Sequence, residues 1–571
     1  MQNLHLAFAA VCLVLVSGAP ARSDVFYKVT PEFADAHLKD LEVEARFPAD
    51  PSGRTLLELP DHGGDDKDWW RLLSDLRVEN AAVQPVSAAE RLLLSKPDAT
   101  ITVRYRVSSG YDHDPTVADG NPYRPIIRPN WFQVMGERIF VAPKGREKTG
   151  VTFRWGPLPA GWNAATNLEH ATAQTVDSAR GSLLLGGADV RIIKRRTAGG
   201  GLLRLAYRGD WAFALDALAD KIAEIGAIED HFWREGGRPY LVSLIPLAPL
   251  PSGHSSGGRG LSEAFALFEE ATVTLDRFPF LLAHERLHTW IPFGLGGLPD
   301  EKDALDYWFS EGFTDFYATR LLLRSGVWSF DEFINRTNER LQGYWRSSAR
   351  NLSNAGIEEA WARDSDARRL PYDRGWLLAS LWDERLRRTS GGRLNLDAAM
   401  LKQRALALEN DAAGVTVRAA QLFPAAYRLA GGGDLAPDFA KYVQGGATVE
   451  LPVDLYGACA SVVFEQIATF DRGFDGEKSA RTGTITGVEL DGPAYAAGLR
   501  DGMKRLGREG DVDGDSRVVI GYRVIDEKGS ERVIRYHPAG KSQVTLQQVR
   551  IAPGLSASQL AACARSVSGG M

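Results

Sequence analysis

The pattern of apolar and polar positions divides the chain into regions with different secondary structure. In residues 24–207, short apolar runs such as 100–105 and 138–141 are separated by Pro, Gly and Asp. This punctuation is typical of β-strands joined by turns. We therefore expect a β-rich N-terminal domain over residues 24–207.

Helical periodicity begins after this region. Apolar residues recur there on one helix face, at Phe213, Leu215, Leu218 and Ile222. Residues 240–245 then form an apolar run typical of a buried strand, and helical patterns follow. We expect a mixed domain over residues 208–445, a smaller β-containing domain over residues 451–553, and a partly disordered tail over residues 554–571.

Length and composition agree with several folded domains. A chain of 571 residues exceeds the roughly 250 to 300 residues that one hydrophobic core can serve. The 44% hydrophobic and 25% charged residues are those of a globular protein. The formal net charge is only −6, and no basic block is interleaved with aromatic residues. These features exclude nucleic acid as a partner.

The N-terminus has the pattern of an export signal. Residues 6–16 are apolar and are followed by residues 19–21, which resemble a cleavage site. We expect a signal peptide over residues 1–21, a periplasmic or secreted mature protein, and no membrane span in it, because no later apolar run approaches ~20 residues. Cys459 and Cys563 then remain, and in an oxidising compartment they either pair or stay free thiols.

A motif that can bind a metal lies in the mixed domain. His284 and His288 are four positions apart, and Glu285 follows the first of them. On a helix this spacing places both imidazoles on one face, where they can share a tetrahedral ion. Apolar neighbours and the nearby Pro292 favour such a helix. Imidazole and carboxylate ligands make zinc the first candidate, with one ion per chain.

A catalytic zinc site needs a third protein ligand and one open position. Glu311 meets this need, because it opens an apolar segment typical of a second helix. Residues 292–300 are rich in Pro and Gly and let the chain turn back. Asp315 lies one turn after Glu311 on the same face. We expect Asp315 to accept the outer N–H of His284 and so to fix its orientation.

Two more residues are candidates for the chemistry. Glu285 cannot bind the same ion from its position between the histidines, but it can reach a water molecule next to the metal. It would act first as general base and then as general acid. Tyr372 is the candidate donor to the oxyanion that forms on an attacked peptide carbonyl. The sequence thus predicts hydrolysis of peptides or proteins.

Three segments resemble the signatures of the glycyl aminopeptidase family, zinc peptidases of the gluzincin type: residues 284–290, 308–314 and 372–375. Their order and spacing match as well. The resemblance implies a multidomain α+β fold with an N-terminal β-sandwich-like domain, a thermolysin-like zinc peptidase domain with a helical lobe, and a C-terminal PDZ domain. It also implies that the PDZ domain can take a peptide ligand by strand addition.

One departure from the family bears on specificity. Such aminopeptidases usually carry an acid before the zinc helix, which holds the α-ammonium of the substrate. Here the acid of the corresponding stretch, Glu263, stands one position later. Either Glu263 takes over this role, or the enzyme has lost exopeptidase specificity and acts as an endopeptidase.

A protein of another class is the alternative, namely a non-catalytic periplasmic scaffold. Its PDZ domain would bind partners, and its metal site would be a remnant. The presence of Glu285 and Tyr372 argues against it, because a structural site needs no base to activate water.

Overall fold

The computed structural model describes residues 25–61, 67–116, 123–170, 174–197, 199–248, 256–261, 263–299, 302–509 and 514–569. They form two compact units, the first made by residues 25–114 and 123–190 and the second by residues 115–116 and 191–569. The expected signal peptide lies outside the described residues. No helix in the described part is both long and apolar enough to cross a bilayer.

Three β-sheets build the first unit. Their strand orders are β11-β1-β2-β7-β4, β10-β3-β6-β5 and β12-β13-β9-β8. Side chains of β1 alternate between buried and partly exposed, so that one face of its sheet covers the core. The strands are β1 (Val25–Ala34), β2 (His37–Pro48), β3 (Arg54–Glu58), β4 (Leu73–Glu79), β5 (Ala82–Pro85), β6 (Glu90–Leu94), β7 (Thr100–Val107), β8 (Ile126–Arg128), β9 (Trp131–Met135), β10 (Ala142–Pro143), β11 (Val151–Trp155), β12 (Asn163–Thr166) and β13 (Leu183–Gly187).

Only one of the two apolar runs that we expected to be strands in this region is a strand. Residues 100–105 lie within β7, as expected, whereas residues 138–141 are not a strand. The chain forms the short helix α1 (Gly136–Ile139) there, and a second short helix, α2 (Val176–Arg180), packs against it. All four side chains of the run 138–141 are buried. The run therefore lacks the alternating exposed face that marks a half-buried strand.

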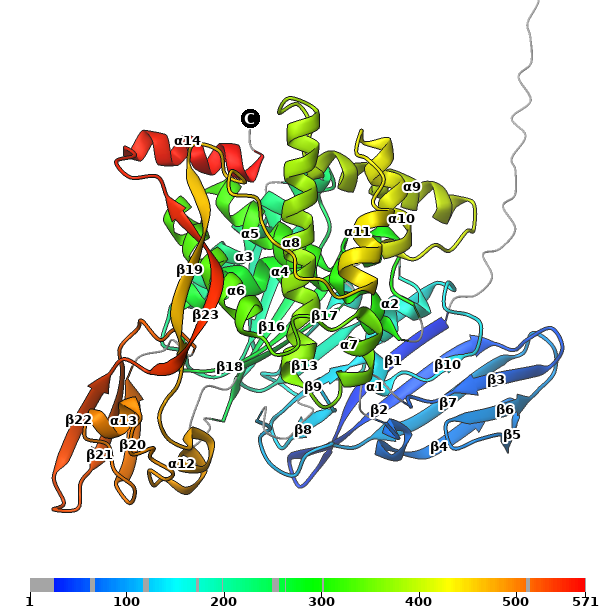
Figure 1. Ribbon diagram of the computed structural model, residues 1–571. Helices are drawn as coiled ribbons and strands as arrows, with labels where there is room; N and C mark the ends of the chain where they lie inside the picture. Colours follow the sequence, from blue (N-terminus) through cyan, green and yellow to red (C-terminus); the bar gives the residue numbers. More distant parts are fainter. Residues whose placement is uncertain are drawn as a thin grey trace, which may run out of the picture. The chain divides into compact units, whose positions relative to one another are not determined.

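A five-stranded mixed sheet begins the second unit (Figure 1). Its order is β14-β15-β16-β18-β17, in which β15, β16 and β18 are parallel and β17 runs antiparallel at the edge. We expected the N-terminal domain to extend to residue 207, but β14 and β15 belong to this sheet. The elements are β14 (Arg191–Arg196), β15 (Leu202–Tyr207), α3 (Leu215–Trp233), β16 (Tyr240–Leu247), β17 (Ser256–Leu261) and β18 (Ala264–Glu270).

Helices follow the sheet and share one large apolar core with it. Helix α3 connects the parallel strands β15 and β16, and the helices after β18 carry the predicted metal site. They are α4 (Phe278–Leu287), α5 (Tyr307–Ser325), α6 (Phe330–Arg346), α7 (Asn354–Ala360), α8 (Ser365–Thr389), α9 (Leu396–Ala412), α10 (Ala419–Leu429) and α11 (Ala436–Asp438), with a π-helical turn (Phe439–Gln444) after α11.

The C-terminal part contains a long ribbon and a small sheet with its own apolar core. The antiparallel ribbon of β19 and β23 contributes to the large core, and Asn338 of α6 exchanges two hydrogen bonds with the backbone of Val549. The ribbon leads to the sheet β20-β21-β22 (Figure 1). These elements are β19 (Ala460–Phe470), α12 (Gly476–Thr482), α13 (Pro493–Ala496), β20 (Lys504–Glu509), β21 (Ile520–Ile525), β22 (Glu531–Tyr536) and β23 (Ala539–Ile551).

The described part of the tail, residues 554–569, has regular structure, contrary to the expected partial disorder. It forms α14 (Ala557–Ser568), which begins with a capping box between Ser556 and Gln559. The disulfide Cys459–Cys563 joins this helix to the residue before β19. Arginines of α5 and α8 donate to carbonyl oxygens in its last turn, and one of these bonds runs from Arg387 Nη1 to Ser566 O at 3.5 Å.

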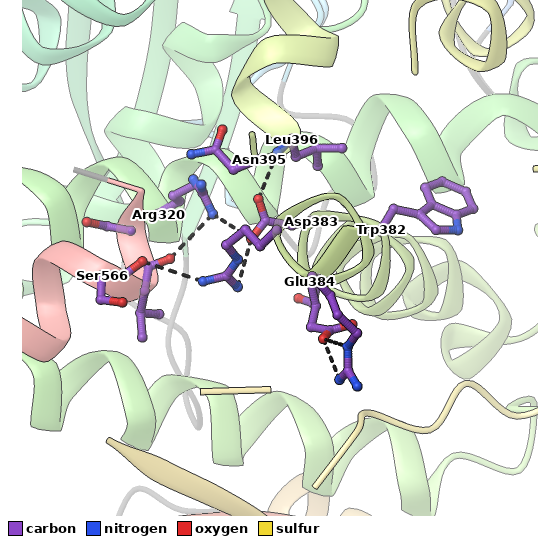
Figure 2. A network of polar contacts seen from close by, with 12 residues as sticks. Arg320, Trp382, Asp383, Glu384, Asn395, Leu396 and Ser566 are labelled. Atoms are coloured by element: carbon purple, nitrogen blue, oxygen red, sulfur yellow. Dashed lines mark hydrogen bonds and ion pairs between the residues drawn. The ribbon is translucent and has the colours of Figure 1, made fainter. Parts of the chain in front are cut away.

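Figure 2 shows how this end of the chain is connected to the helices. The Asp383 carboxylate binds the guanidinium groups of Arg320 at 3.2 Å and Arg387 at 2.9 Å, and it accepts the N–H of Leu396. α14 therefore packs on a buried ionic network that joins α5, α8 and α9.

Candidate metal centre

Helix α4 presents the two histidines of the motif. Pro279 lies in its first turn, where a missing N–H costs nothing, and Leu282, Ala283 and Leu287 anchor it in the core. His284 lies in the last turn of α4, and His288 is its C-terminal capping residue. Both rings therefore stand at the end of a buried helix.

Helix α5 presents the third candidate ligand. It begins at Tyr307 and ends at Ser325, so that Glu311 lies in its second turn and Asp315 one turn later. A Cβ atom at Gly312 would lie 2.4 Å from the Cα of Gly375 in α8. Only glycine at both positions allows the backbones to approach so closely. This contact fixes α8, and with it Tyr372, beside the ligand helix.

Three ligand atoms converge on one point. His284 Nε2 lies 3.2 Å from His288 Nε2. Glu311 Oε2 lies 3.4 Å from the first nitrogen and 3.6 Å from the second. Bonds of about 2.0–2.1 Å to a tetrahedral zinc ion would separate the ligand atoms by about 3.3 Å. The three atoms thus have the spacing that such an ion requires.

The hydrogen bonds of the two rings define their proton states. His288 Nδ1 lies 2.8 Å from the carbonyl oxygen of Ile291, which can only accept, so Nδ1 carries the proton. His284 Nδ1 lies 2.8 Å from Asp315 Oδ1, which is the partner that the sequence predicted. In the neutral rings both Nε2 atoms then present lone pairs to each other and to a carboxylate. A cation resolves this repulsion.

The electrostatics of the site also favour positive charge. Burial opposes the charged form of His284, but hydrogen bonds to Asp315 and Glu311 outweigh it and raise the pKa of His284 well above its usual value. Burial would raise the pKa of Glu311, yet His288 and His284 lower it below its usual value. The residues fit a divalent cation held by two imidazoles and a carboxylate.

Glu285 and Tyr372 both lie near the ligands. A Cβ atom at Gly260, on the edge strand β17, would be only 2.9 Å from Glu285 Oε2, so the Glu285 carboxylate lies against that strand. The Tyr372 ring stacks near the His284 ring, with centroids 6.3 Å apart. Burial first, and then the carboxylate of Glu311, raise the pKa of Tyr372 well above its usual value. Tyr372 therefore keeps its proton and can donate it in a hydrogen bond.

Glu263 lies apart from this group. It occupies the turn between β17 and β18 with a positive φ of 53°, and Glu263 Oε1 is 3.9 Å from Arg238 Nη1. Burial raises its pKa above the usual value, while Arg238 and Arg286 oppose this shift. Among the described contacts none joins Glu263 to the metal ligands, and its role in holding a substrate ammonium stays a prediction.

Two residues of the site had no signal in the sequence. Ile291 orients His288 through its backbone carbonyl, a contact that no side-chain pattern encodes. Arg340 of α6 donates to Asp315 Oδ2, which adds a buried cation behind the carboxylate that orients His284. Arg340 is one of many arginines in the helical region, and only the packing of α6 against α8 singles it out.

Comparisons with known proteins match one segment of the chain to a peptidase family. The sequence profile of the M61 glycyl aminopeptidases matches residues 277–365, the segment that contains all three candidate ligands. No curated protein sequence matches the chain.

Solved structures give the fold. An aminopeptidase N family protein from Idiomarina loihiensis has a TM-score of 0.62 at 17% identity, over 94% of this chain and 99% of that one. An M1 zinc metallopeptidase from Deinococcus radiodurans has a TM-score of 0.46 at 15% identity, over 75% of this chain and 93% of that one. The chain thus has a multidomain α+β fold similar to that of an aminopeptidase N family protein, and the segment with the three candidate ligands matches a peptidase family.

Proposed function

We propose that the protein is an exported zinc metallopeptidase that removes N-terminal residues from peptides. The convergence of His284 Nε2, His288 Nε2 and Glu311 Oε2 within 3.6 Å carries the proposal. The match to the glycyl aminopeptidase profile over the same residues supports it. Export rests on the N-terminal sequence pattern alone.

The residues around the site can perform hydrolysis. Zinc, when bound, polarises the scissile carbonyl and lowers the pKa of a water molecule toward ~7. Glu285 takes a proton from the attacking water and later delivers it to the leaving amine. The Tyr372 hydroxyl, which stays protonated, donates to the developing oxyanion. The edge strand β17 offers backbone groups to an extended peptide beside Glu285.

The finer features of the proposal concern specificity and partners. We assign the α-ammonium of the substrate to Glu263, which is 24% exposed and forms a long ion pair of 3.9 Å with Arg238. We assign the small sheet within residues 451–553 to a PDZ domain that captures a peptide ligand, while β19 and β23 of the same range pack on the large core. The separate core of the small sheet supports an independent binding unit.

A peptide screen with a matched variant tests the proposal. The wild-type protein should cleave unblocked peptides and leave N-acetylated peptides intact, because a blocked terminus has no ammonium for Glu263. Glu285→Gln should keep one zinc per chain and lose hydrolysis by several orders of magnitude. Cleavage of blocked peptides would make the enzyme an endopeptidase. Absence of all cleavage in the zinc-loaded wild type would favour the scaffold.

A further inference from the structure

Helix α6 contributes no predicted ligand, yet one of its side chains reaches the centre of the site. Arg340 is only 8% exposed, and its guanidinium donates through Nη2 to Asp315 Oδ2. Through Nη1 it donates to Asp373 Oδ1 at 2.8 Å. The other oxygen of Asp315 accepts from His284, and Asp373 directly follows Tyr372 in the sequence. A single side chain thus links the histidine ligand to the helix that bears the tyrosine.

The charges around Arg340 show why a cation is needed there. Asp315 and Asp373 are both buried, and the charge of Asp315 disfavours the ionised form of Asp373. Arg340 counteracts this repulsion, because its positive guanidinium donates a hydrogen bond to an oxygen of each carboxylate. Arg369 of α8 also favours the charged form of Asp373, from 3.2 Å, but its side chain is 59% exposed, whereas the buried Arg340 contacts both aspartates.

Only an arginine can make both contacts together. Its planar fork presents two nitrogen atoms to two carboxylates at once, whereas a lysine ammonium is a point charge on a flexible stem. A buried carboxylate without its partner would rotate toward water or take up a proton. Either change would release the hydrogen bond that orients a ligand ring.

We propose that Arg340 is a positioning residue that holds His284 through Asp315 and Tyr372 through Asp373 at the same time. The inference rests on the proposed function only for the tyrosine side. The histidine side, which is the orientation of His284 through Asp315, concerns metal affinity. It does not depend on the reaction that the centre performs.

Zinc affinity tests the histidine side without any assay of hydrolysis. Apo protein is titrated with zinc in competition with a chromogenic chelator, for the wild type, Arg340→Gln and Arg340→Lys. We expect Arg340→Gln to bind zinc about 10- to 100-fold more weakly, the usual effect of losing an outer-shell partner, and Arg340→Lys to restore only part of the affinity.

Arg336→Gln is the matched control. Arg336 lies one turn earlier on α6 and lines the same cavity of about 730 Å³. It pairs with the exposed Glu339 at 3.3 Å, and among the described contacts none joins it to either buried aspartate. Its zinc affinity should stay within about twofold of the wild type. An equal loss in this control would assign the effect to the cavity or the helix rather than to Arg340, and would overturn the proposal.

Peptide kinetics test the tyrosine side. Asp373→Asn keeps the shape of the side chain and leaves the Asp315–His284 contact in place. We expect it to lower kcat at least tenfold, to change KM less than about twofold, and to bind zinc as the wild type does. Thermal unfolding of every variant identifies those that fail to fold. Arg340→Lys then replaces Arg340→Gln, and Asp373→Ser replaces Asp373→Asn.

The outcomes separate this inference from the proposed function. If Arg340→Gln binds zinc as tightly as the wild type, or if Asp373→Asn keeps the wild-type kcat, Arg340 does not position the site. If the wild type cleaves no peptide while Arg340→Gln still loses zinc affinity, the peptidase proposal fails and the histidine side of the inference stands.

Discussion

A methyl group at residue 260 tests whether Glu285 must lie where the structure places it. The Cβ atom of Gly260→Ala would lie 2.9 Å from Glu285 Oε2, 3.4 Å from the Glu285 carbonyl oxygen and 3.5 Å from His288 Cδ2. Non-bonded carbon and oxygen atoms approach to about 3.3 Å. The carboxylate must therefore retreat by about 0.4 Å, while the histidine ring, already at an ordinary contact distance, can stay in place.

The displacement translates into a modest rate loss. A misplacement of about 1 Å costs about 100-fold in rate, so about 0.4 Å costs roughly sixfold if the barrier scales linearly. Gly260 has no positive φ, so alanine fits the strand, and the free energy of unfolding should change by less than about 1 kcal/mol.

Three measurements on Gly260→Ala test the position of Glu285: kcat on an unblocked peptide, zinc content and the free energy of unfolding. Gly343→Ala is the control, because its added Cβ meets no atom within 4 Å. It should keep the wild-type kcat. A wild-type kcat in Gly260→Ala would show that Glu285 does not act from its position beside β17, and a loss of zinc would show that the histidine had moved instead.

Further predictions concern stability. Cys563→Ser opens the disulfide that spans 104 residues, and should lower the free energy of unfolding in denaturant by about 4 to 5 kcal/mol in the chain-entropy model. Gly375→Ala places a Cβ 1.8 Å from the Trp308 carbonyl, and should lower the melting temperature and the zinc affinity together. Burial, against the pull of Arg286, raises the pKa of Glu229 to about 8 from 4.5. The folded state keeps a proton that the unfolded state releases, so the free energy of unfolding should fall as the pH rises from about 4.5 to 8. In Glu229→Gln this free energy, measured by denaturant unfolding at both pH values, should depend less on pH.

The candidate metal ligands could be predicted because their geometry is local. The spacing of His284 and His288 is one helical turn, and Glu311 and Asp315 repeat this spacing on the second helix. The apolar segments around both pairs identify buried helices. One tertiary contact, that of α4 with α5, then brings the pairs together. The Asp315–His284 hydrogen bond was predicted on the same basis and is confirmed.

The errors arose where structure depends on distant parts of the chain. Strands β14 and β15 were assigned to the N-terminal domain, because parallel pairing with β16 occurs across a whole helix and leaves no local pattern. The contact of Arg340 with Asp315 likewise spans 25 positions. By contrast, α14 had a local signal, the capping box between Ser556 and Gln559 ahead of an apolar stretch, and that signal was missed.

Anomalous diffraction from crystals of the zinc-loaded protein tests the central claim most directly. The account predicts a single strong peak at the zinc edge, with His284 Nε2, His288 Nε2 and a Glu311 carboxylate oxygen about 2.0–2.2 Å from it. A peak at another place, or a zinc ion that Glu311 does not contact, would contradict it.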